Sequence, residues 1–256
     1  MKITPIKTRI VTPPRDDLEE VIRAAISTLA ERSIVVVTSK VVSIGQGRCV
    51  SIDEVKDKDQ LAIDEAEAYV PRDAIPGGYA LHTYKNNLLI SSSGVDASNG
   101  DGFYILWPEK PYDAAEQIRV FLQTTYNVTD VGVIITDSRG LPLRRGAVGV
   151  SIGYAGFTPL RDYRGDSDIF GRKIREGQAN IVDGLAAAAV VAMGEGSETT
   201  PIAVVEGMAS DLFMDHGQLS DRPFSSLEVS KEEDKFYPLL APGLWKKGGA
   251  DHSSSD

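Results

Sequence analysis

The stretch 131–173 carries the residue types that most clearly predict chemistry. An apolar, β-branched run at 131–136 is interrupted by Asp137, and Ser138 follows directly. This order predicts a buried strand that ends at Asp137 and delivers a carboxylate into a turn. Because functional side chains concentrate in loops that a rigid scaffold positions, Asp137 is the first candidate site residue.

Basic residues gather just beyond this carboxylate. Eight basic residues lie within 139–175, whereas 137–175 contains four acidic residues. The basic residues are Arg139, Arg144, Arg145, Arg161, Arg164, Arg172, Lys173 and Arg175. Since the whole chain has a net charge of -10, this local excess predicts a binding patch for an anionic ligand.

Two further segments bring polar side chains to predicted strand ends or turns. The apolar strand 34–37 runs into Ser39 and Lys40, so a hydroxyl and an ammonium arrive together, which suits a phosphate. The alternative is a solvated lysine in a connection. Asp96 lies in the most turn-rich run, 92–102, where it either shapes the turn or binds a ligand. An EF-hand is excluded because no Glu stands at the twelfth position of the loop.

Composition limits the class of protein. With 256 residues, 42% of them hydrophobic, the chain can bury a large core in one large or two smaller domains. Its acidic balance argues against nucleic-acid and membrane-surface binding, because both partners are polyanions. Cys49 is the only cysteine, so an intrachain disulfide and a Cys-based zinc site are excluded. No apolar run reaches 18 residues, and we expect a cytoplasmic protein.

The elements that must position these residues follow from hydrophobic periodicity. Helices are expected at 18–29, 60–69, 113–126 and 178–193. Strands are expected at 34–37, 87–91, 131–136, 147–155 and 201–205, with an Arg-, Asp- and Gly-rich loop at 157–170. We therefore expect an α/β (α+β) protein with mixed or antiparallel sheets. Residues 1–245 form one catalytic unit, with room for two subdomains, and 246–256 form a disordered tail.

One catalytic motif competes with this interpretation. Residues 149–153 read G-x-S-x-G, and Asp183 and His216 follow in the chain order of an α/β-hydrolase triad. The context is missing, because Ser151 lies inside an alternating strand pattern with no helix behind it. P-loop and dinucleotide fingerprints are absent, and the three histidines are scattered. A serine hydrolase using Ser151 remains the rival hypothesis.

Several short segments, taken together in order, resemble the coenzyme F420-0:γ-glutamyl ligase family. They are 38–43, 47–48, 94–96 with 98–99, 131–137, 152–153 with 155–156, 162–165, 168 with 170–172, and 185–189 with 193–195. The resemblance covers roughly 1–207. As an ordered set these segments are far more specific than any one of them.

The resemblance implies an enzyme that joins L-glutamate to a cofactor carboxylate through an acyl phosphate, using GTP and Mg²⁺ or Mn²⁺. It also implies an intertwined homodimer. The metal ligands implied are Asp96, Asp137, Glu195 and the hydroxyl of Ser138, which stands where the family usually has threonine. Such hard cations prefer oxygen ligands and assist phosphoryl transfer by bridging phosphate oxygens.

The same resemblance implies the binding residues for the nucleotide and the two anionic substrates. Nucleotide contacts would come from Thr8, Arg9, Ile10, Val11, Ser39, Lys40, Asn99, Met193, Gly194, Glu195, Gly196, Ser197, Glu198, Thr199 and Thr200. Substrate anions would be held by Arg139, Arg144, Arg164 and Arg172. No side chain need act as a nucleophile, since positioning and electrostatics can carry the reaction.

The chain departs from the family pattern at a few positions. Ile44 replaces the usual second lysine, Leu141 and Leu143 replace arginine and tryptophan, and Gly184 replaces an acidic residue. These changes spare the metal set and concern the acceptor pocket. The open alternatives are therefore a folate γ-glutamyl ligase with the same chemistry, ATP in place of GTP, and an inactive homologue that binds nucleotide.

Overall fold

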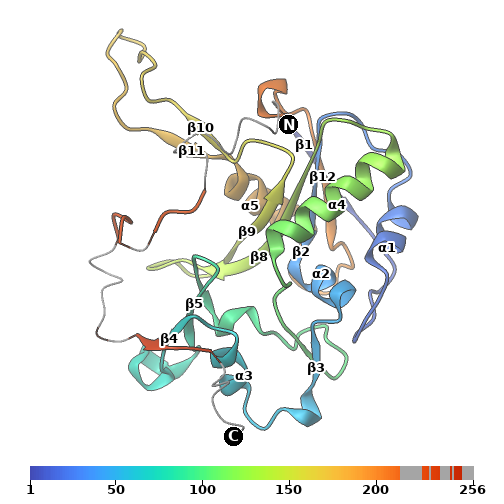
Figure 1. Cartoon of the computed structure of the whole chain (residues 1–256), viewed down its shortest axis with the longest axis vertical. Coiled ribbons are helices and arrows are strands. Elements are labelled where there is room, and N and C mark those ends of the chain that lie inside the picture. The colour runs from blue at the N-terminus through green and yellow to red at the C-terminus, as the bar shows by residue number, and fades with distance from the viewer. Residues whose placement is uncertain (214–226, 231, 237–242, 244, 250–256) are drawn as a thin grey trace, which may run out of the picture.

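A five-stranded sheet forms the centre of the computed structural model (Figure 1). The structure describes residues 1–213, 227–230, 232–236, 243 and 245–249. The sheet order is β1 (Lys2–Ile6), β12 (Ile202–Glu206), β2 (Ser33–Thr38), β8 (Val131–Gly140) and β9 (Ala147–Ala155). β2 and β8 pair in parallel, and the other neighbouring strands are antiparallel. The predicted α/β class with mixed sheets is confirmed.

Helices cover both faces of this sheet. On one face lie α1 (Leu18–Ala25), α2 (Ser39–Gln46) and α4 (Pro111–Tyr126), and on the other lies α5 (Ile181–Met193). In β2, Val35 and Val37 belong to the first core cluster, whereas Ile34 and Val36 belong to the second. A strand that is buried on both faces needs apolar residues at every position, which explains the uninterrupted run 34–37.

A smaller antiparallel sheet lies below the central sheet in Figure 1. Its strands are β13 (Lys246–Lys247), β4 (Ala68–Val70), β5 (His82–Lys85) and β6 (Leu88–Ser91). Beside it lie α3 (Lys58–Asp64) and the strand pair β3 (Cys49–Ser51) and β7 (Phe103–Ile105). Single 3₁₀ turns span Ile52–Glu54, Arg72–Ala74, Pro76–Gly78, Ser92–Gly94 and Ser210–Phe213. A separate small core of Ala62, Leu81, Val95 and Leu106 supports this region.

A hairpin arm projects from the body beyond β9 (Figure 1). Its base is formed by β10 (Leu160–Asp162) and β11 (Gln178–Asn180), which pair antiparallel. The sequence predicted a loop at 157–170 and a helix that begins at 178, and both boundaries were wrong. The pairing joins residues far apart in the chain, so local periodicity does not reveal it.

Other predicted boundaries also need correction. β8 does not end at Asp137 but continues to Gly140, because it pairs with β9 beyond a bulge between Ile135 and Thr136. Lys40 stands in the first turn of α2, not in a connection. The helix expected at 60–69 is divided into α3 and β4. The helix expected to continue to 29 ends at Ala25.

The predicted tail begins with ordered residues. Lys246–Lys247 pair with β4, and the N–H groups of Gly248 and Gly249 donate to the carbonyls of Glu67 and Ile63. Residues 250–256 lie outside the described part of the chain. Among the described helices, none combines the length and apolar character that a membrane crossing requires.

Candidate functional site

The candidate site forms where the parallel strands β2 and β8 run side by side. Thr38 lies opposite Thr136 in this pairing, so the first residues of α2 stand next to Asp137. The carboxyl ends of neighbouring parallel strands are a common place for ligands in α/β proteins. The strand pair therefore brings Ser39 and Lys40 to a carboxylate that is distant in the sequence.

Lys40 connects α2 to the segment that carries Asp96. Its ammonium donates to Asp96 Oδ2 over 2.8 Å, and to the carbonyl and hydroxyl oxygens of Ser98 over 2.6 and 2.8 Å. These acceptors use all the N–H bonds of the ammonium. Burial acts to raise the pKa of Asp96, but hydrogen bonds from Lys40 and Ser98 outweigh it and lower the pKa to about 2. Asp96 is therefore ionised at neutral pH.

Asp137 is a half-buried carboxylate with a donor on each oxygen. Trp107 Nε1 donates to Oδ2, and the backbone N–H of Ser138 donates to Oδ1 over 2.9 Å. Burial raises the pKa of Asp137, while these donors and the charge of Lys40 act in the opposite direction. The balance leaves the pKa of Asp137 above its ordinary value, and a further positive charge near this carboxylate would stabilise its ionised form.

The loop after α5 brings a third carboxylate to β8. Ser138 Oγ donates to Glu195 Oε1 over 2.8 Å. Asn99 Nδ2 donates to the carbonyl of Gly196 over 3.0 Å. The loop is thus tied to β8 and to the segment that carries Asp96, which brings together three parts of the predicted site.

The rest of this loop is mostly open to solvent. Its exposed residues are Glu195, Gly196, Ser197 and Glu198, whereas Gly194, Thr199 and Thr200 are half-buried and Met193 is buried. The N–H of Gly196 donates to Glu198 Oε2 over 2.8 Å, and the hydroxyl of Thr200 donates to the carbonyl of Met193. The loop closes on itself while leaving an exposed rim beside Asp137.

The N-terminal segment meets this loop at Thr199. The N–H of Thr8 donates to the carbonyl of Thr199 over 3.0 Å. Arg9 instead faces α1, where its guanidinium contacts Asp16 at 2.7 and 2.9 Å and also Glu20. The other predicted contacts of this segment are the exposed Ile10 and the buried Val11. Arg9 is therefore committed to carboxylates of its own chain.

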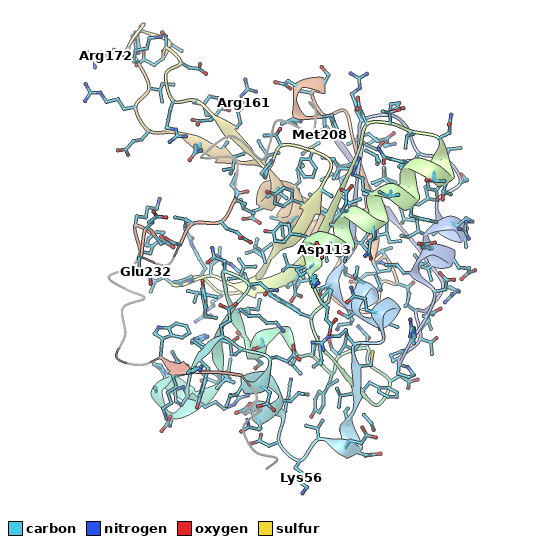
Figure 2. The ribbon with its side chains drawn as sticks, viewed as in Figure 1. Lys56, Asp113, Arg161, Arg172, Met208 and Glu232 are labelled. Carbon is cyan, nitrogen blue, oxygen red and sulfur yellow. The ribbon has the colours of Figure 1, made fainter. Side chains whose placement is uncertain are left out.

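The four arginines predicted to hold the substrates fall into two groups. Arg139 lies on β8 close to Asp137, and Arg144 lies in the exposed turn before β9. Arg164 and Arg172 belong to the arm, and Figure 2 shows Arg172 at its far end. Arg164 also pairs with the carboxylate of Asp162. Within one chain, the arm arginines are not brought to Asp137.

The oxygen atoms of the site are held in separate pairs and do not form a closed cluster around one point. Within the part of the chain that the structure describes, no three His, Cys, Asp or Glu side chains are grouped closely enough to hold a metal ion. Lys40 instead pairs with Asp96, its charge acts on Asp137 without a direct hydrogen bond, and Ser138 contacts Glu195. Mg²⁺ commonly takes one or two carboxylates and completes its shell with water and phosphate oxygens. These donors would hold a hard cation only together with further oxygen ligands, such as water or phosphate.

The surroundings of Ser151 are not those of a catalytic nucleophile. It lies inside β9 with 3% of its surface exposed, and its hydroxyl donates to the carbonyl of Gly153 over 3.2 Å. Asp183 accepts the N–H of Ser151 over 2.9 Å, and His216 lies outside the described residues. A Cβ at Gly149 would stand 2.6 Å from Val190 of α5, so this glycine allows close helix packing. The G-x-S-x-G pattern is thus structural.

Two contact residues were missed from the sequence. Ser98 accepts from Lys40, and its N–H donates to Asp96 Oδ1 over 2.9 Å. The Asp-x-Ser spacing is a recognisable side-chain turn and could have indicated this contact. Trp107 follows an apolar pair in the chain, and no local pattern distinguishes its role from that of an ordinary core aromatic.

The structure is a mixed α/β fold whose parallel strands β2 and β8 bring a lysine and carboxylates into one site. The chain belongs to the F420-0:Gamma-glutamyl ligase family, whose match covers residues 5–207.

Individual members with curated names are similar over most of the chain. The coenzyme F420:L-glutamate ligase of Methanopyrus kandleri is 33% identical over 229 residues, which cover 83% of this chain and 89% of that protein. The protein of the same name from Methanothermobacter thermautotrophicus is 31% identical, with 75% and 83% covered. The one from Methanocaldococcus jannaschii is 36% identical, with 69% and 67% covered.

Proposed function

We propose that this chain joins L-glutamate to a carboxylate of an F420-0-type acceptor, using GTP and a divalent cation. The names of the relatives support the ligation of glutamate and the F420-type acceptor. The observation that carries the chemistry is that the Lys40–Asp96 pair at the start of α2 and Asp137 on the neighbouring strand β8 share one site, where Glu195 contacts Ser138.

The proposed reaction has two steps. A carboxylate does not condense with an amine in water, so one acceptor oxygen first takes the γ-phosphoryl group of GTP and GDP leaves. The glutamate amine then attacks the acyl carbon, loses a proton and expels inorganic phosphate, which leaves an amide. A bound divalent cation would neutralise the phosphate oxygens during the first step.

The residues of the site have separate tasks in this proposal. Lys40 is placed to exchange one of its acceptors for a phosphate oxygen, because its ammonium is half-buried and lies at the start of α2. Asp137 and Ser138, with Asp96 and Glu195, supply the oxygen donors for Mg²⁺ or Mn²⁺. Arg139 and Arg144 are the basic residues nearest in the chain to these donors and would attract the anionic substrates.

Mass spectrometry of the acceptor tests this function. Incubation with F420-0, glutamate, GTP and Mn²⁺ should give an acceptor that is longer by glutamate, together with GDP. Asp137→Ala should abolish the product because a carboxylate donor to the cation is lost, whereas Asp73→Ala, at an exposed position away from these contacts, should retain it.

Parallel reactions separate the alternatives that share this chemistry. A folate acceptor would identify the folate ligase, and ATP in place of GTP would assign the nucleotide. Thermal stabilisation by nucleotide without product from either acceptor would identify an inactive homologue and contradict the proposal.

We also propose that two copies of this chain form a dimer in the cytoplasm. The arm exposes two large apolar side chains at its far end, Ile169 at 91% and Phe170 at 83%. On α5, Val191 is 86% exposed. Apolar surface of this kind is typical of an interface, and the family resemblance favours a second copy as the partner.

A further inference from the structure

Trp107 is a buried aromatic residue that directs its polar atom at the candidate site. Its side chain is among the largest that are fully buried, with 1% of the residue exposed. The indole N–H, which can only donate, is bonded to Oδ2 of Asp137. The other oxygen of this carboxylate, Oδ1, accepts a hydrogen bond from the backbone N–H of Ser138. Trp107 thereby fixes the rotation of the Asp137 side chain.

Gly94 provides the space that the indole needs. Its φ is +75°, a backbone conformation that L side chains rarely adopt. A Cβ at this position would stand 2.0 Å from Trp107 Nε1 and 2.2 Å from Cδ1. The glycine in the turn that leads to Asp96 therefore leaves room for the indole, whose N–H reaches the carboxylate of Asp137.

An ionic cluster of the buried Lys85 and the half-buried Glu65 and Arg48 contacts Trp107. Lys85 Nζ lies 5.8 Å from the centre of the indole ring and 2.6 Å from Glu65 Oε2. Arg48 contacts the same Glu65 oxygen at 2.7 Å, and its Nε donates to the carbonyl of Trp107 over 3.2 Å. Lys85 is only 9% exposed.

Charges withdrawn from water in this way rarely add stability by themselves. The proposed reaction does not use them. What they do in this structure is fix both the ring and the backbone of Trp107.

We infer that Trp107 is a positioning residue, which holds Asp137 Oδ2 so that the free lone pairs of this carboxylate face the divalent cation. The inference rests on the proposed function, because it takes Asp137 as a ligand of that cation. Hydrogen-bond partners of metal ligands orient them, and their loss commonly weakens metal affinity by about 10- to 100-fold. The Gly94 turn and the Lys85–Glu65–Arg48 cluster would act through Trp107.

Mn²⁺ binding tests this role without turnover. Trp107→Phe keeps an aromatic ring but removes the N–H. Titration of the protein with Mn²⁺ alone, followed by electron paramagnetic resonance of the free ion, should show about 10- to 100-fold weaker binding in this variant. Trp245→Phe is the matched control, since the chain has two tryptophans, and it should bind Mn²⁺ like the wild type. Circular dichroism and melting curves check that both variants are folded.

If Trp107→Phe does not fold, nuclear magnetic resonance of the protein with Trp107 intact tests the same role. The indole N–H resonances of the wild type are assigned by their loss in Trp245→Phe. The Trp107 resonance should lie downfield, as expected for a donor to a carboxylate, and should shift saturably with Mg²⁺ while that of Trp245 does not.

The outcomes distinguish this inference from the proposed function. Wild-type Mn²⁺ affinity in a folded Trp107→Phe, or a Trp107 resonance that is indifferent to Mg²⁺ while the wild type binds Mn²⁺, overturns the positioning role and leaves the ligase proposal intact. If the wild type itself binds no Mn²⁺, the metal site fails and the positioning role fails with it.

Discussion

At the scale of residues, the charged groups of the site are already paired with one another. Lys40 binds Asp96 and Ser98, and Asp137 has a donor on each oxygen. An entering phosphate must therefore displace an acceptor of Lys40, whereas a cation could use the lone pairs of Asp137 that Trp107 and Ser138 leave free. In the free protein the existing contacts compensate the carboxylates, since an uncompensated half-buried charge is unfavourable.

The Lys40–Asp96 pair predicts a specific dependence of stability on pH. The pKa of Asp96 is lowered from 3.8 to about 2, so its ionised form contributes stability above pH 3.8, and this contribution is lost as the pH falls toward 2. Lys40→Met should remove this contribution, which for a pair with 26% and 49% side-chain exposure is about 1 kcal/mol or less. Urea unfolding at pH 5 and pH 2.5 measures it.

The control for this experiment is Lys56→Met, at an exposed lysine. The stability difference between Lys40→Met and the wild type should shrink at pH 2.5, whereas Lys56→Met should show no comparable change. A difference for Lys40→Met that is the same at both pH values would refute the assignment of the pKa shift to Lys40.

At the scale of elements, hydrophobic periodicity predicted the segments in which apolar residues recur at one regular spacing, that of a strand or that of a helix. Residues 147–155 form β9 with the expected bounds, and the helix predicted at 113–126 is α4, which begins two residues earlier. Pairings between distant segments were missed, because local patterns do not encode them. Asp137 was placed at a strand end, yet it lies within β8 because β9 pairs alongside it.

The same reasoning explains how far the site could be predicted. Lys40 and Asp137 follow uninterrupted apolar strands, so their position at the sheet was visible in the sequence. Asp96 and Glu195 were assigned by resemblance, since turn-rich segments carry no periodic signal. The contact of Trp107 with Asp137 depends on a turn at Gly94 and on an ion cluster from other segments. Such three-dimensional contacts have no counterpart in the linear spacing.

Because Ser151 is buried inside β9, we expect it to be dispensable for catalysis. Ser151→Ala removes the hydroxyl bond to Gly153 and should lower the free energy of unfolding by about 1 kcal/mol. Ligase activity should be retained, because the hydroxyl is buried in the strand and contacts no site residue. Steady-state kinetics and urea unfolding measure the two effects. Cleavage of an activated ester without nucleotide by the wild type, lost in a folded Ser151→Ala, would instead support the rival hydrolase.

At the scale of the whole molecule, the arm is the feature that a single chain leaves unexplained. Arg164 and Arg172 belong to this arm, whose far end is marked by Arg172 in Figure 2, and the arm exposes the apolar side chains of Ile169 and Phe170. A second copy of the chain would cover these side chains and would give the arm arginines a partner surface. The two groups of predicted substrate arginines could then belong to different subunits.

Disruption of the arm tip tests the dimer. The wild type should have a mass in solution of twice 27.6 kDa by light scattering. Phe170→Asp places a charge in the expected apolar contact and should shift the protein toward 27.6 kDa, whereas Lys56→Met should leave the mass unchanged. A wild type that is monomeric at micromolar concentration would remove the dimer from the proposal.

The central claim, activation of an acceptor carboxylate by phosphoryl transfer, is tested most directly by oxygen isotopes. F420-0 labelled with ¹⁸O in its reacting carboxylate is incubated with the protein, glutamate, GTP and Mn²⁺, and the released phosphate is analysed by mass spectrometry. The proposed reaction predicts that each phosphate carries an ¹⁸O atom from the acceptor, in step with the amount of amide formed. Amide formed with unlabelled phosphate would contradict the acyl-phosphate mechanism, and unlabelled phosphate without amide would contradict the ligase function itself.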